Sequence, residues 1–190
     1  MTKAEARKRI IDYLKMYHIP YRLLNNSGKP LAVDDLTLYI QFHVEKAPDH
    51  LAECSIWFHE KSFEVRAYFS ENAAGWVNKH KGRIPDVLRV INFMNARVFF
   101  GSLFTPRLYL TADEKPEFAI TTVIPYLFFE TAELETLEYI TCFYPEFLDK
   151  ASFPLFLTLL GKITPEMAFY HIKTKLLNEK DACVEWNGDD

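Results

Sequence analysis

The residue types that most often carry chemistry are scattered along this chain of 190 residues. Its histidines show neither the HxxxH nor the HxH spacing that places two imidazoles on one face of a helix or strand. Three cysteines, Cys54, Cys142 and Cys183, are odd in number and widely spaced, which fits neither a disulfide framework nor a zinc ligand pattern. We therefore predict no metal site and no internal disulfide, and we expect a reducing bacterial cytoplasm as the location.

Motifs for nucleophilic catalysis and phosphate binding are missing from the sequence as well. There is no GxSxG elbow, no Walker-type loop and no dinucleotide loop, and no two of the six glycines lie close together. Asp34-Asp35 precedes a strand, where turn chemistry is the usual role of such a pair. Glu133, Glu135 and Glu138 fall in the first turns of a predicted helix, where the dipole favours acids. We predict a non-enzymatic protein without a cofactor, and an enzyme with an unfamiliar site stays as an alternative.

Composition limits the partners. Hydrophobic residues make up 49% of the chain, which is enough for a packed core, and the net charge is −4. An acidic chain needs a local basic patch to bind nucleic acid. The basic residues near the N-terminus (Lys3, Arg7, Lys8 and Arg9) are interleaved with acids on one helix, as on a solvated face. No signal peptide and no apolar run of about 18 residues is recognisable, so we expect neither a nucleic acid nor a membrane as partner.

The first half of the chain alternates like a β-sheet. Residues 2–18 have the apolar spacing of an amphipathic helix, and residues 21–24 predict a short strand. Three runs then alternate apolar and polar residues with a period of two: Leu36–Val44, Leu51–His59 and Phe63–Phe69. They predict a three-strand meander with one buried face, which comprises Leu38, Ile40, Phe42, Ile56, Phe58, Val65 and Phe69.

The register of the last two runs follows from the same pattern. A two-residue turn at Glu60-Lys61 would pair Phe58 with Phe63, and it would put the apolar residues of both strands on one face. Because Glu-Lys is poor turn chemistry, a longer loop is the alternative.

The second half alternates helical and strand patterns. A polar connection over 71–81, with at most a helical turn, leads to a helix over 85–98, and a second hairpin is formed by Arg107–Leu110 and Phe118–Ile124. A helix capped by Thr131 is expected to end at Pro145. Two further helices are predicted, over 152–160 and after Thr164.

Aromatic and charged residues gather at the outward positions of the meander. Tyr39, Trp57, Arg66 and Tyr68 lie there together with acids. Tyr, Trp and Arg are enriched at the centres of protein interfaces, so these four residues form the candidate protein-binding site. Two alternatives stay open: a C-terminal helix covers this face, or cross-strand aromatic pairs stabilise it.

One known family shares the central segment. The segment Asp86–Asn95 is followed by the turn Phe100-Gly-Ser-Leu-Phe104, the strands of the second hairpin with Pro125, and an acidic helix from Thr131. Over residues 3–145 this resembles the type III secretion chaperone-like fold, and within it the YbjN-like group, described as bacterial sensory transduction regulators. The resemblance implies binding of a protein or peptide segment and a homodimer, and it implies no catalytic residues.

We therefore predict an α+β fold, with an antiparallel sheet packed by helices in the order α-β-β-β-α-β-β-α and extra C-terminal helices. The expected organisation is a chaperone-like domain over 1–145, a helical extension over 146–180 packed on it, and a loose tail over 181–190. The predicted function is a chaperone-like or regulatory protein-binding module of the bacterial cytoplasm. The alternative is a small-molecule-responsive sensor with a ligand between sheet and helices. The homodimer contact is expected at the helix Pro85–Ala96 or at a strand edge.

Overall fold

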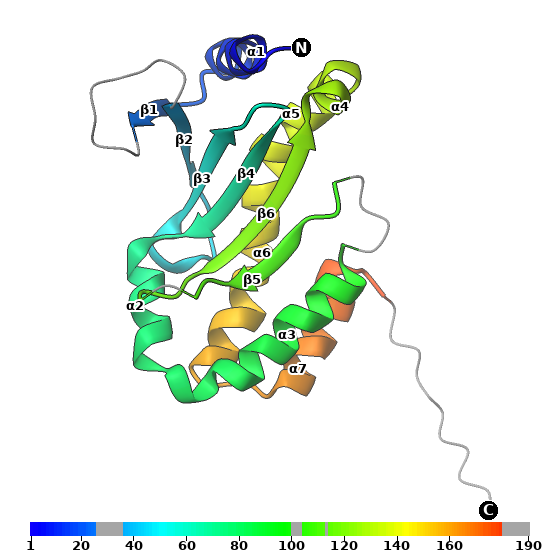
Figure 1. Cartoon of the computed structure of the whole chain (residues 1–190). Coiled ribbons are helices and arrows are strands. Elements are labelled where there is room, and N and C mark those ends of the chain that lie inside the picture. The colour runs from blue at the N-terminus through cyan, green and yellow to red at the C-terminus, as the bar shows by residue number, and fades with distance from the viewer. Residues whose placement is uncertain (26–35, 100–103, 113, 180–190) are drawn as a thin grey trace, which may run out of the picture.

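A six-stranded antiparallel sheet forms the centre of the computed structural model, which describes residues 1–25, 36–99, 104–112 and 114–179 (Figure 1). The strand order is β1-β2-β3-β4-β6-β5. The strands are β1 Tyr21–Asn25, β2 Leu36–His43, β3 Leu51–Phe58, β4 Ser62–Phe69, β5 Arg107–Leu110 and β6 Phe118–Pro125. The predicted α+β class with an antiparallel sheet is confirmed.

The β3–β4 hairpin has the register that the apolar pattern predicts. Phe58 pairs with Phe63, and the His59 N–H donates to the carbonyl oxygen of Ser62 at 2.9 Å. The turn is therefore the two-residue one, Glu60-Lys61, and the longer loop was wrong. All-apolar pairing on one face outweighs the poor turn chemistry.

The meander has four strands, so the prediction of three was one short. The short strand β1 pairs with β2, with Leu23 opposite Leu38. The second hairpin then joins the other side through its longer strand, because β6 pairs with β4 and leaves β5 outside. The pairing of β1 was not apparent because ten residues (26–35), outside the described part, separate it from β2.

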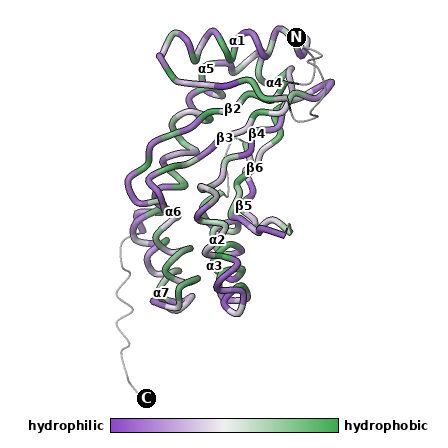
Figure 2. Tube along the Cα trace, turned by 90° about the vertical axis from the view of Figure 1, so that its left-hand side faces the viewer, coloured by the Kyte–Doolittle hydropathy of each residue, from purple (hydrophilic) through white to green (hydrophobic). Residues whose placement is uncertain are grey.

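Helix α6 lies against one side of the sheet, and the other helices gather at its two ends, with α1, α4 and α5 at one end and α2, α3 and α7 at the other (Figures 1 and 2). The helices are α1 Lys3–Met16, α2 Glu71–Lys79, α3 Ile84–Arg97, α4 Tyr126–Thr131, α5 Glu133–Glu138, α6 Tyr144–Leu159 and α7 Pro165–His171. Two π-helical segments, Tyr139–Phe143 and Ile172–Leu176, follow α5 and α7. The segment 71–81, expected to be a mainly polar connection, is largely helix α2.

The helical run after β6 differs from the prediction at both ends. The Thr131 hydroxyl donates to the Phe128 carbonyl oxygen at 2.9 Å, so this residue belongs to the end of α4, and Ala132 precedes α5. Pro145 does not end the helix: it lies in the first turn of α6, where a helix tolerates proline. Helical structure is continuous from α5 through Tyr139–Phe143 to α6, and the expected boundary at 145 falls inside this run.

One apolar core fills the space between the sheet and the helices. Of the expected core residues all are buried except Phe42, which is half-buried near the end of β2. Cys54 is fully enclosed, and burial raises the pKa of its thiol. Cys142 is exposed, whereas Cys183 and the expected loose tail over 181–190 lie outside the described residues. None of the described helices has the length and apolar character needed to cross a bilayer.

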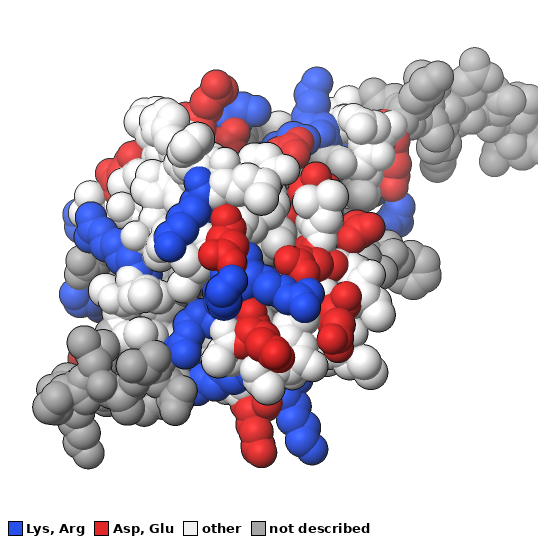
Figure 3. Space-filling view, turned by 90° about the horizontal axis from the view of Figure 1, so that it is seen from above, with Lys and Arg blue, Asp and Glu red and all other residues white. Residues whose placement is uncertain are grey.

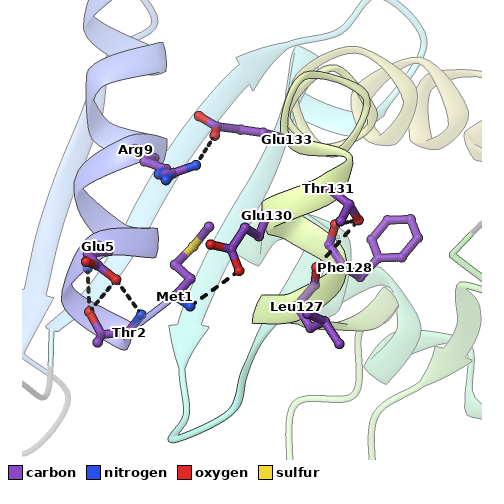
Figure 4. A network of polar contacts seen from close by, with 9 residues as sticks. All are labelled: Met1, Thr2, Glu5, Arg9, Leu127, Phe128, Glu130, Thr131 and Glu133. Carbon is purple, nitrogen blue, oxygen red and sulfur yellow. Dashed lines mark hydrogen bonds and ion pairs between the residues drawn. The ribbon is translucent and has the colours of Figure 1, made fainter.

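Polar contacts attach α1 to the helices after β6 (Figure 4). The Glu5 carboxylate accepts from the Thr2 N–H at 2.7 Å and the Thr2 hydroxyl accepts from the Glu5 N–H at 3.2 Å, which is a capping box. Arg9 forms an ion pair with Glu133 at 2.7 Å. Figure 3 shows basic and acidic side chains side by side on this end of the molecule. Lys8 and Arg9 are exposed as expected, but Arg7 is buried with its guanidinium over the Phe58 ring, so the solvated face predicted for it was wrong.

The edge strand β5 is held by helix α3. The Asn95 amide nitrogen donates to the Leu108 carbonyl oxygen at 2.8 Å, and its amide oxygen accepts from the Leu108 N–H at 2.9 Å. The side chain thus satisfies the backbone as a neighbouring strand would. Next to it, Met94 is fully buried, which makes it part of the core and not of an α3 surface.

Candidate functional site

The four residues of the candidate site lie on the same face of the sheet, which we call the aromatic–charged face and define by Tyr39, Trp57, Arg66 and Tyr68. Tyr39 is opposite Ser55, and Ser55 is opposite Arg66, so one row crosses three strands. Trp57 and Tyr68 occupy the neighbouring rows. Because side chains alternate along a strand, these residues point away from the buried core face.

Arg66 is at the centre of this face. Its guanidinium carbon lies 5.7 Å from the centroid of the Trp57 ring, a cation–π distance. Its Nη2 is 3.0 Å from a carboxylate oxygen of Glu64, and the same oxygen accepts from the Thr121 hydroxyl at 3.1 Å. These contacts hold the guanidinium over the indole ring.

The charge state of Glu64 follows from these partners. Partial burial acts to raise the pKa of its carboxyl, but the hydrogen bonds from Arg66 and Thr121 outweigh burial, and the pKa is lowered. Glu64 is therefore ionised at neutral pH. His59 lies 3.7 Å from the same carboxylate at the rim of the face.

The two tyrosines contribute hydroxyl groups. The Tyr68 hydroxyl is 3.1 Å from the Ser55 hydroxyl, and burial raises the pKa of Tyr68 to about 12. The Gln41 amide donates to the Tyr39 hydroxyl at 3.4 Å. Burial and a hydrogen bond to Glu53 raise the pKa of Tyr39 as well. Both phenols therefore stay protonated at neutral pH.

The face is open within the described part of the chain. Trp57 keeps 39% of its surface accessible, and Val123, on the adjacent strand β6, keeps 58%. Helix α6 packs on the opposite side of β3 and β4, and α7 packs on α3 and α6, so the alternative that these C-terminal helices cover this face is wrong (Figure 1). The cross-strand contact on this face is the Arg66–Trp57 cation–π pair and not the expected pair of aromatic rings, and the Arg66–Glu64 contact lies within β4.

Sequence reasoning missed two contributors, Thr121 and Val123. Both alternate outward on β6, but nothing in the sequence indicates that β6, and not β5, lies beside β4. The alternation of Phe118–Ile124 indicated which of its residues point outward, but it did not indicate which strand lies beside them.

The chemistry of this face is that of recognition. It offers a guanidinium, an indole, phenols and a carboxylate, which can stack, pair with charges and donate hydrogen bonds. Among the described residues no group of three or more His, Cys, Asp or Glu side chains is arranged to hold a metal ion.

Neither a family profile, nor a curated protein, nor a solved structure matches this chain.

Proposed function

We propose that the protein is a non-enzymatic protein-binding module, chaperone-like or regulatory, of the bacterial cytoplasm. The observation that carries the proposal is the aromatic–charged face: one side of the sheet holds the core, and the other presents Trp57, Arg66 and two tyrosines with no described helix over them. Trp, Tyr and Arg are enriched at the centres of protein interfaces. A sheet face that carries them and is not covered by a helix has the composition of such a centre.

The organisation of the face supports a protein or peptide segment as the partner. Arg66 and Glu64 already compensate each other, so the face carries no strong excess of charge that would select a polyanion. Trp57 and Val123 add apolar area on neighbouring strands. A partner that covers them gains apolar burial at the centre and contact with the Tyr39 and Tyr68 rings beside it.

The resemblance to the type III secretion chaperone-like fold and its YbjN-like group belongs to the same proposal. A helix, an antiparallel meander, a helix, a hairpin and a helix follow one another along the chain in that order. This order supports a partner-binding role and a homodimer.

The test is affinity capture from native bacterial lysate, followed by mass spectrometry of proteins and of small molecules in the eluate. The wild-type chain is compared with a Trp57→Ala, Arg66→Gln variant and with Met167→Ala, which changes an exposed residue of α7 away from the sheet. We expect a defined protein that the wild type and Met167→Ala retain and that the double variant loses. Equal capture by all three chains would refute the assignment of the site.

The small-molecule sensor is the second candidate function, because a lysine-lined pocket lies between a sheet connection and the C-terminal helices. In the capture experiment a metabolite without any protein would favour it.

A further inference from the structure

A pocket lies away from the aromatic–charged face. It is a pocket of about 320 Å³ where the β2–β3 connection meets α6 and the helical segment that begins with α7. We call it the lysine pocket, and its lining residues are Lys46, Lys150, Phe153, His171, Lys175 and Leu176. Its volume is at the lower end of the usual range for small-molecule sites, about 300–1,000 Å³.

Positive charge predominates in the lysine pocket. Lys150 is neutralised by Glu146, whose carboxylate oxygen is 2.5 Å from its Nζ. The other nearby acid, Asp149, accepts a hydrogen bond from the backbone N–H of Lys46 at 2.5 Å. Within the described residues, the ammonium groups of Lys46 and Lys175 have no ion-pair partner. A backbone N–H does not neutralise Asp149, but the three lysines still outnumber the two acids, so the charge of the pocket stays positive.

The histidine in the lysine pocket responds to both of these lysines. Partial burial is the first cause that lowers the pKa of His171, and the charges of Lys175 and Lys46 lower it further. Lys46 precedes β3 and Lys175 follows α7, and both line the same pocket as His171. An anion between them would relieve their mutual repulsion.

One wall of the lysine pocket is flat and apolar. The rings of Phe153 and His171 stack with their centroids 4.4 Å apart and their planes 26° apart. Leu176 adds an aliphatic side chain, and Phe153 is 43% exposed although it is a large apolar residue. A ligand with a planar apolar body would cover this ring, and its anionic group would then reach the lysines.

We propose that the lysine pocket binds a small phosphate monoester with a planar apolar body. A monoester carries a charge of about −1.5 to −2 at neutral pH and several acceptor oxygens, so it can contact the ammonium groups of Lys46 and Lys175 together, with more charge than a single carboxylate offers. Lysine binds phosphate as a point charge and needs no bidentate geometry. This site does not depend on the aromatic–charged face, so either proposal can fail without the other.

The test uses phenyl phosphate as the probe and isothermal titration calorimetry on the full chain. We expect binding of phenyl phosphate, weaker binding of inorganic phosphate, and none of phenol. A Lys46→Gln, Lys175→Gln variant should weaken binding of the ester at least about tenfold. The matched control is Lys162→Gln, an exposed lysine outside the pocket lining, which should bind as the wild type does.

A second readout is the proton NMR titration of His171. The bound dianion offsets the charges of Lys46 and Lys175. The midpoint of the His171 titration should therefore move to higher pH with phenyl phosphate and stay unchanged with phenol. Phosphatidylcholine vesicles with and without phosphatidic acid separate a lipid headgroup from a soluble ester. Binding to vesicles with phosphatidic acid, without binding of phenyl phosphate, would overturn the proposal of a soluble ligand and would show that the pocket recognises the phosphate of a lipid headgroup. No binding of either probe, or equal binding by the double variant, would overturn the site.

Discussion

At the scale of single residues, Asn95 has the clearest energetic role, because one amide side chain satisfies both backbone groups of Leu108 on the edge strand β5. Asn95→Ala leaves a partly buried N–H and carbonyl oxygen without these partners, and we expect the free energy of unfolding to fall by about 1–3 kcal/mol. Urea denaturation measures the change. The control Asn92→Ala, an exposed residue one turn earlier, should stay within about 0.5 kcal/mol of the wild type. Equal effects of both changes would show that the Asn95 bonds contribute nothing specific.

Glu64 gives a prediction about pH. Its pKa is lowered in the folded state, so its contribution to stability is complete above the unfolded pKa of about 4.3 and is lost as pH falls through the folded pKa. Glu64→Gln removes this titration. We therefore expect the variant to lose less stability than the wild type between neutral pH and about pH 3, as measured by urea midpoints. Glu60→Gln, an exposed acid in the β3–β4 turn, is the control and should follow the wild type.

At the scale of elements, strand β2 separates the two faces of the sheet residue by residue. Ile40 is fully buried and its neighbour Gln41 is exposed. Ile40→Ala should cost about 2–5 kcal/mol of unfolding free energy, since it loses transfer energy and leaves a cavity. Gln41→Ala should change stability by less than about 0.5 kcal/mol. Chemical denaturation of both variants checks the assigned faces, and a cost below about 1 kcal/mol for Ile40→Ala would contradict them.

Some of the strands, helices and pairings could be predicted from the sequence, and others could not. Period-two alternation identified β2, β3 and β4 and the register of β3 with β4, because a shift by one residue would have exposed every apolar side chain. The neighbours of β4 and the pairing of β1 depend on contacts between distant segments, which a local pattern does not contain. The continuous helix across Pro145 was missed because the same proline ends one helix or begins another. For the aromatic–charged face, alternation found four members, and the strand order supplied Thr121 and Val123.

At the scale of the whole molecule, the expected homodimer has fewer possible contacts than the sequence suggested. Asn95 occupies backbone groups of β5, and α3 packs against α6 and α7. The edge that remains among the described strands is β1, where Leu23 and Leu24 are each 42% exposed. An edge strand with exposed apolar residues pairs readily with a second copy.

We therefore expect a dimer by light scattering, and a Leu23→Lys, Leu24→Lys variant should become monomeric because charges on an edge oppose pairing. Leu88→Glu changes a residue on the exposed side of α3 and tests this helix as the contact. It should leave the dimer intact. A monomeric wild-type chain would defeat the prediction, and a dimer split only by Leu88→Glu would move the contact to α3.

The buried thiol of Cys54 can be used to measure how often the native structure opens. A thiol reagent attacks the thiolate, and this sulfur lies on a central strand with no accessible surface. In a chain with Cys142→Ser and Cys183→Ser, uptake of one label therefore requires the sheet to separate from its helices. The labelling rate under native conditions then reports how often this happens, and its dependence on denaturant distinguishes a local opening from complete unfolding.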